Sequence, residues 1–196
     1  MKAVIIDLTL HALAFGTGAL ILWILLSWCC FKIRSYRTAD SPAPSLNKRR
    51  FLVQGCFVFY LAALIHITVI RNGIHIFPLS QHTFDSVSLI PFVDLMALAK
   101  RGFWPFAYMF VGNLVWFVPF GVFISVGTGY RAGPGSVMIR GFLVSLSIEC
   151  LQWLFDSGVS DVDDLILNTL GAAIGWVLAR LFRRVLSGLP TVSRNR

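Results

Sequence analysis

Five apolar stretches, each about as long as a bilayer is thick, leave this chain very few ways to fold. They cover approximately residues 8–31, 51–70, 106–126, 137–155 and 164–182. A helix of about 20 apolar residues crosses the hydrocarbon core of a membrane and pairs all its backbone groups internally. The sequence therefore predicts an all-α fold, a polytopic transmembrane helical bundle of about five spans.

The composition excludes an ordinary water-soluble domain. Only 13 % of the residues are charged and 57 % are hydrophobic, whereas a soluble domain carries about 25 % charged residues. The four cysteines lie in or at the edges of the apolar stretches without metal-binding spacing, and we interpret them as packing residues. We expect a multi-pass integral protein of the cell membrane.

The gaps between the spans predict the orientation of the chain. The first gap, the third gap with its edge, and the C-terminal tail are basic, whereas the fourth gap holds Asp156, Asp161, Asp163 and Asp164 without a base. Basic loops face the cytoplasm. We therefore expect the N-terminus outside and the C-terminus in the cytoplasm.

The same pattern divides the chain into three parts. Residues 1–50 are expected to form an N-terminal transmembrane helix and a basic cytoplasmic loop, with a turn-rich Pro42–Ser45 segment beside anionic lipid. Residues 51–186 form the main transmembrane bundle, and residues 187–196 a basic cytoplasmic tail. The long second gap, from Arg71 to Pro105, is moderately apolar, and we expect it to lie on the membrane surface or re-enter it.

With this orientation, the polar residues of the spans gather near the outer face. Ser145, Glu149 and Gln152 share one face of the fourth span, because they are spaced four and three apart. On the fifth span the same spacing predicts a polar stripe above a seam formed by Gly171 and Gly175, which lets helices approach closely. The candidate functional cluster comprises Arg71, Asn113, Glu149, Gln152, Asp161, Asp164 and Asn168.

A carboxylate in hydrocarbon is costly, about 2.5 kcal/mol or more, so Glu149 needs a partner, a proton or water. We hypothesise an ion pair of Arg71 with Glu149 or Asp164. A purely structural network that locks the bundle is an equally weighted interpretation, since buried polar groups also hold helices together.

Other chemistry finds little support in the sequence. The acidic run at residues 161–164 offers oxygen ligands for a divalent cation, but it has no second ligand set, so no metal or cofactor is expected. The four histidines share no zinc-site spacing. Hydrolase elbows and phosphate loops are absent, and the basic residues follow the membrane gaps rather than a nucleic-acid-binding face. The sequence indicates no nucleic-acid partner and no identifiable catalytic residue.

Four segments together carry a family resemblance. They read Ser-Leu-Ile-Pro-Phe from residue 88, GNLVWFVPFG over 112–121, SLSIECLQ from residue 145, and DVDDLILNTLGAAIG from residue 161. In this order the chain resembles the VanZ-like family over about residues 59–182. The family often has Arg before the first Asp of the last segment, whereas here Ser160 stands there. That departure leaves Arg71 as the better candidate for a counter-charge.

The resemblance implies a bacterial cell-envelope protein, in a family named for a protein linked to low-level antibiotic resistance to the glycopeptide teicoplanin. The polar cluster suits binding of a membrane lipid, or of a lipid-linked or lipoglycopeptide head group, at the outer leaflet. Two alternatives stay open: an intramembrane enzyme that uses Glu149 or Asp164 as general base on a lipid head group, and a transporter or scaffold subunit. Protein partners are not indicated.

Overall fold

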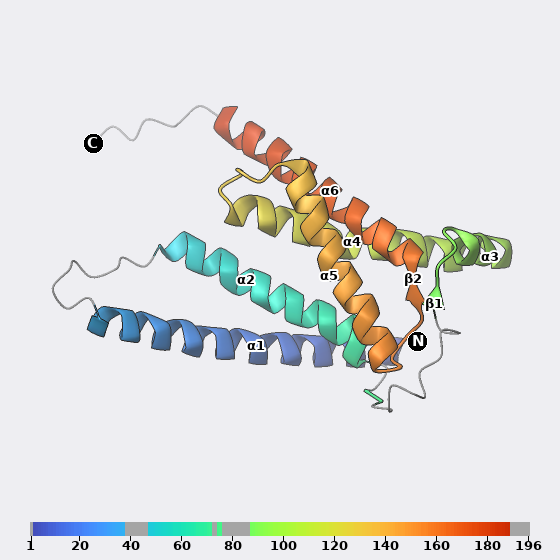
Figure 1. Cartoon of the computed structure of the whole chain (residues 1–196), viewed down its shortest axis with the longest axis horizontal. Helices are drawn as coiled ribbons and strands as arrows, with labels where there is room; N and C mark the ends of the chain where they lie inside the picture. The colour runs from blue at the N-terminus through green and yellow to red at the C-terminus, as the bar shows by residue number, and fades with distance from the viewer. Residues whose placement is uncertain (1, 38–46, 72–73, 76–86, 189–196) are drawn as a thin grey trace. The chain divides into compact units, whose positions relative to one another are not determined.

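The computed structural model describes residues 2–37, 47–71, 74–75 and 87–188 (Figure 1). In chain order its elements are α1 (Lys2–Arg37), α2 (Lys48–Ile65), the π-helical turn η1 (His66–Ile70), β1 (Val87–Ser88), α3 (Val93–Arg101), α4 (Phe103–Gly127), α5 (Pro134–Leu154), β2 (Ser160–Asp161) and α6 (Val162–Gly188). The turn-rich Pro42–Ser45 segment, residues 76–86 of the second gap and residues 189–196 of the tail lie outside the described residues.

The prediction of five membrane spans is confirmed by length and composition. The apolar helical segments are Leu10–Trp28, Lys48–Ile70, Phe103–Gly127, Pro134–Leu154 and Val162–Ser187. Several helices extend beyond the apolar stretches that predicted them. For α2 the reason is a cap: the side chain of Asn47 accepts a hydrogen bond from the backbone N–H of Arg50 at 3.1 Å, so the helix begins among basic residues.

Four small elements were not predicted from the sequence. The end of the second span widens into η1, where the N–H of Arg71 donates to the carbonyl of His66 at 2.9 Å. The second gap contains α3, with Asp94 in its first turn and Lys100 and Arg101 in its last, as the helix dipole favours. The two-residue strands β1 and β2 pair in parallel, Val87 with Ser160 and Ser88 with Asp161.

The chain divides into two compact units, described separately below. Unit 1 comprises residues 1–86 and 148–159, and unit 2 comprises residues 87–147 and 160–196. In unit 1, α1 packs along α2. Gly16 of α1 faces the ring of Phe59, and Gly55 of α2 faces Trp23, whose ring lies 4.4 Å from that of Phe51. A glycine on each helix thus makes room for an aromatic ring of the other helix.

In unit 2, the backbones of α4 and α6 are in contact, as the spacing of Gly171 and Gly175 predicted. A Cβ atom added to Gly171 would lie 2.2 Å from the carbonyl oxygen of Leu114, and one added to Gly175 would lie 2.1 Å from that of Val118. From α4, Gly121 approaches the carbonyl of Ala172 as closely. These positions admit only glycine, and the glycines fix the register of the two helices.

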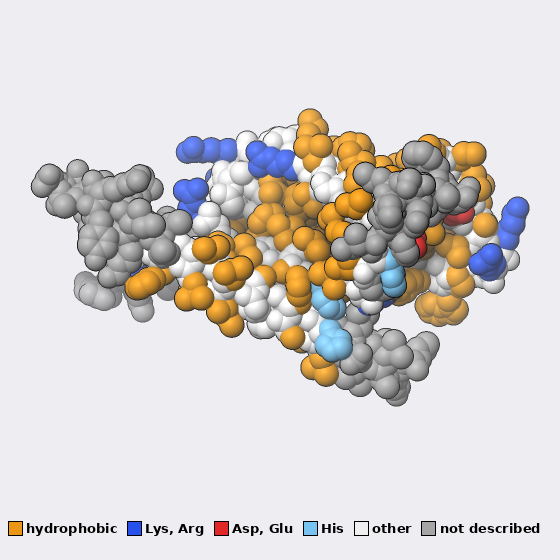
Figure 2. Space-filling model, turned by 60° about the horizontal axis from the view of Figure 1, so that its bottom comes forward, with side chains coloured by type: hydrophobic (Ala, Val, Ile, Leu, Met, Phe, Trp, Pro, Cys, Tyr) orange, Lys and Arg blue, Asp and Glu red, His pale blue; other side chains and the backbone are white. Residues whose placement is uncertain are grey.

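Large hydrophobic side chains are exposed on most helices. Trp104 is 80 % exposed and Tyr108 79 %, and Figure 2 shows hydrophobic side chains across the visible surface. Apolar exposure on this scale marks a surface meant for a nonaqueous environment or a partner. It agrees with helices that present their outer faces to lipid.

A buried polar cluster at the start of α6

The start of α6 is held by a side chain from the strand before it. Asp161 is the last residue of β2, and its carboxylate accepts a hydrogen bond from the backbone N–H of Asp163 at 2.9 Å. An acidic side chain in this place caps the free N–H groups of a helix and meets the positive end of its dipole. The parallel pairing of Ser88 with Asp161 fixes the cap against the segment before α3.

Asp163 ties that segment to α6. Its side chain is 1 % exposed, and its Oδ1 accepts a hydrogen bond from the backbone N–H of Phe92 at 2.7 Å. Phe92 has a φ of 67°, a left-handed conformation rarely adopted by an aromatic residue. Two residues further on, Asp94 accepts a hydrogen bond from the hydroxyl of Ser88 at 2.5 Å. The Ser-Leu-Ile-Pro-Phe segment is therefore folded against the first turn of α6.

Deeper along α6, two polar side chains reach the neighbouring helices. Asp164 accepts a hydrogen bond from the amide nitrogen of Asn113 on α4. One turn later, the amide of Asn168 donates to the hydroxyl of Ser145 on α5 at 2.9 Å. Ser145 is fully buried and Asn168 is 6 % exposed. These bonds connect α6 to both neighbouring helices by side chains that the bilayer could not solvate.

The cluster is acidic. Burial raises the pKa of the Asp161 carboxyl above its ordinary value, and the nearby charges of Asp163 and Asp94 add to that effect, while the N–H of Asp163 opposes it. In Asp163 the second oxygen, Oδ2, is buried and accepts no hydrogen bond from the described part of the chain. The oxygens of this cluster suit ligand groups that donate hydrogen bonds, such as hydroxyls and amines.

Metal binding finds no geometric support here. Within residues 2–37, 47–71, 74–75 and 87–188, no group of three or more His, Cys, Asp or Glu side chains is arranged to hold a metal ion. The carboxylates of the cluster are instead used as acceptors for backbone and amide N–H groups.

The predicted site residues fall into both units. Asn113, Asp161, Asp164 and Asn168 belong to unit 2 and meet around the first turns of α6, although Asp161 lies in β2 rather than in the helix. Arg71, Glu149 and Gln152 belong to unit 1.

In unit 1, Gln152 and Arg71 lie at the end of the second span. Gln152 donates a hydrogen bond at 3.1 Å to the carbonyl of Thr68, within η1. Thr68 lies in the last turn of the span, where backbone carbonyls have no partner within the helix. Glu149 is 5 % exposed, and Arg71 lies exposed directly after η1. The ion pair of Arg71 with Glu149 or Asp164 stays a prediction.

Sequence reasoning left four contributing residues out of the candidate cluster. Asp163 falls off the helical stripe that selected its neighbours, and Ser145 was counted only as part of a helical face. The Ser88–Asp94 pair could not be connected to α6 by periodicity. Ser88 and Asp163 lie in two of the motifs that carry the family resemblance, Ser-Leu-Ile-Pro-Phe and Asp-Val-Asp-Asp. The structure brings these two motifs together. Their joint presence in the family pattern is the signal that could have pointed to them.

Fold and site define a class: a polytopic helical membrane protein whose last three spans contribute to a buried polar cluster. The VanZ/LLP1 family model matches residues 57–183, which include every residue of the cluster. The chain belongs to the VanZ-like family.

A curated relative supports the assignment. The chain is similar to Protein VanZ of Enterococcus faecium, with 26 % identity over 132 residues, which cover 66 % of this chain and 74 % of the relative. No solved structure matches the chain.

Proposed function

We propose that this VanZ-like protein binds the polar head group of an amphiphile at the extracytoplasmic end of its bundle. The observation that carries the proposal is the set of polar side chains around the start of α6, led by Asp164, which accepts a hydrogen bond from Asn113, and Asn168, which donates one to Ser145. The proposed orientation, with the N-terminus outside and the C-terminus in the cytoplasm, puts this end of α6 at the outer leaflet.

The chemistry of the cluster selects the kind of ligand. Carboxylate and amide oxygens accept hydrogen bonds from sugar hydroxyls and amino groups. The exposed apolar faces of the helices accommodate an acyl chain. A lipid-linked sugar or a lipoglycopeptide of the teicoplanin type combines both features. The proposal includes a role in the cell envelope and in glycopeptide resistance.

The test compares two variants of the protein in lipid nanodiscs. Asp164→Asn keeps the shape of the side chain and removes its charge, and we expect it to weaken binding of fluorescent teicoplanin or of a labelled lipid-linked sugar about tenfold, since a hydrogen bond to a charged group contributes about 1.5 kcal/mol or more. Asp156→Asn, at an exposed position, is the matched control and leaves binding unchanged.

Three results would contradict the proposal in different ways. Equal binding by the wild type and Asp164→Asn removes the cluster as the site. Unchanged teicoplanin susceptibility on deletion and on overexpression removes the resistance role. Turnover of the labelled lipid favours the alternative of an intramembrane enzyme, with Asp164 as the base.

A further inference from the structure

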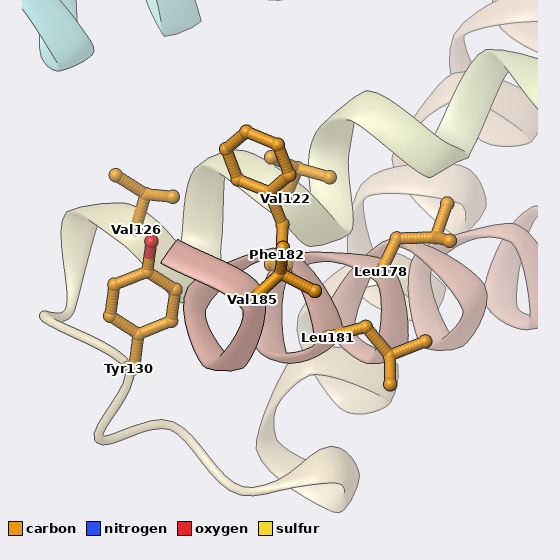
Figure 3. Close-up of a pocket in the computed structure, with 8 residues that line it drawn as sticks. Val122, Val126, Tyr130, Leu178, Leu181, Phe182 and Val185 are labelled. Carbon is orange, nitrogen blue, oxygen red and sulfur yellow. The ribbon is translucent and has the colours of Figure 1, made fainter. Parts of the chain in front are cut away.

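A second feature of unit 2 lies at the other end of α6, away from the polar cluster. A groove of about 430 Å³ runs between α4 and the last turns of α6. Figure 3 shows the side chains around it. Its lining is apolar apart from one hydroxyl and consists of Val122, Val126, Tyr130, Leu178, Ala179, Leu181, Phe182 and Val185.

Tyr130 is the polar end of this groove. It lies in the loop after α4 with a φ of 64°. The guanidinium of Arg183 lies 4.7 Å from the centroid of its ring. Arg180 donates hydrogen bonds at 3.2 Å to the carbonyls of Tyr130 and Ala132, and Trp176 donates to Ala132 at 2.9 Å. The loop that forms this end of the groove is thereby clamped to α6.

The charges around the clamp are all positive. Residues 95–148 and 165–196 contain no Asp or Glu. Arg131 follows Tyr130 directly, Arg184 follows Arg183, and all three arginines, Arg131, Arg183 and Arg184, are exposed. An apolar groove with a phenol and several guanidinium groups at one end complements a molecule with an acyl chain and a negatively charged head group.

We propose that this groove is a binding site for an anionic phospholipid. One acyl chain lies against Val126, Leu178 and Phe182, and the phosphate is held by Arg183 with Arg131 and the Tyr130 hydroxyl. Arginine favours phosphate because its planar donor fork matches two oxygens at once. The site is distinct from the head-group cluster, and it would persist if that cluster bound nothing.

Native mass spectrometry of the full-length protein tests this directly. The protein is released from micelles that hold equal amounts of phosphatidylglycerol and phosphatidylcholine, and retained lipid is counted. We expect preferential retention of phosphatidylglycerol. Arg183→Gln should lower that retention about fivefold, as expected when one basic side chain near an anionic head group is removed. Arg101→Gln, at the exposed end of α3, is the matched control and should leave it unchanged.

A second variant tests the acyl-chain part. Val126→Trp fills the groove and should reduce retention of phosphatidylglycerol, whereas Val111→Trp, on an exposed face of the same helix, should not. Equal retention of the two lipids by the wild type overturns the proposal, as does retention that neither Arg183→Gln nor Val126→Trp changes. A dimer that Val126→Trp dissociates would also overturn it, because a second copy would then cover the groove.

Discussion

The two ends of α6 fasten the neighbouring loops by opposite chemistry. At its start, Asp163 accepts a hydrogen bond from the backbone N–H of Phe92. Towards its end, Arg180 and Trp176 donate hydrogen bonds to the backbone carbonyls of Tyr130 and Ala132. The acids at the start of α6 also suit the helix dipole, which favours negative charge at an N-terminus.

The comparison teaches that one charge pattern serves two purposes. Acids in the first turn of α6 stabilise the helix. The contrast between this acidic start and the arginines later in the helix also predicts the side of the membrane on which each end lies. The acidic end is largely enclosed, with hydrogen bonds from α6 to α4 and to α5. The basic end is open, with exposed arginines beside an apolar groove.

The largest expected effect comes from the seam that both ends share. Gly175→Val places a Cβ 2.1 Å from the carbonyl oxygen of Val118, so α4 and α6 must separate. We expect a loss of about 3 kcal/mol in the free energy of unfolding, the upper part of the usual range for overpacking. Thermal unfolding in detergent measures it. Gly112→Val is the control, because a Cβ atom at this position meets no other atom. An equal loss of stability in the two variants would contradict the close packing of α4 against α6 at Gly175.

The basic end alone should respond to Arg180→Ala. The substitution removes two hydrogen bonds to the loop after α4 and the contact of the guanidinium with Trp176, 4.5 Å from its ring centroid. We expect the free energy of unfolding to fall by about 1.5 kcal/mol, and proteolysis of the loop to become faster. Arg184→Ala removes the same charge from an exposed position and should leave both unchanged. Equal proteolysis rates would show that the clamp does not hold the loop.

A smaller effect should follow at the polar end from Ser145→Ala. This variant leaves the amide of Asn168 without its partner on α5, at a cost of roughly 1 kcal/mol for a bond between membrane helices. The control is Ser147→Ala, since Ser147 bonds only to the carbonyl of Leu143 on its own helix and is exposed. Chemical unfolding in mixed micelles compares them. Equal stabilities of the two variants would mean that the amide of Asn168 finds another hydrogen-bond partner.

The smallest effect is a pH dependence at the acidic end. Burial raises the pKa of Asp161 in the folded protein, so the folded state binds this proton more tightly than the unfolded state. Its contribution to stability is complete below the unfolded pKa and is lost as the pH rises through the folded pKa. Asp161→Asn should therefore make the unfolding midpoint fall less steeply with rising pH. Identical slopes would show that Asp161 is not the group responsible.

The sequence by itself determined the membrane fold. Five apolar stretches require helices, since the backbone has no other partner in hydrocarbon. The spacing of Asp164, Asn168, Gly171 and Gly175 placed them on one face of α6, because periodicity within a helix is a local property. The close approach at Gly171 and Gly175, and the shared face of Asp164 and Asn168, were predictable from that spacing.

Only the tertiary structure decided which partners those residues meet. The pairing of β1 with β2 and the bond from Phe92 to Asp163 join segments about 70 residues apart, and no local period records such contacts. The groove beside Tyr130 likewise depends on which side chains of α4 and α6 the fold brings together. The sequence determines on which face of its helix each side chain lies. The residue that it contacts on another helix depends on long-range packing, which is a property of the whole chain.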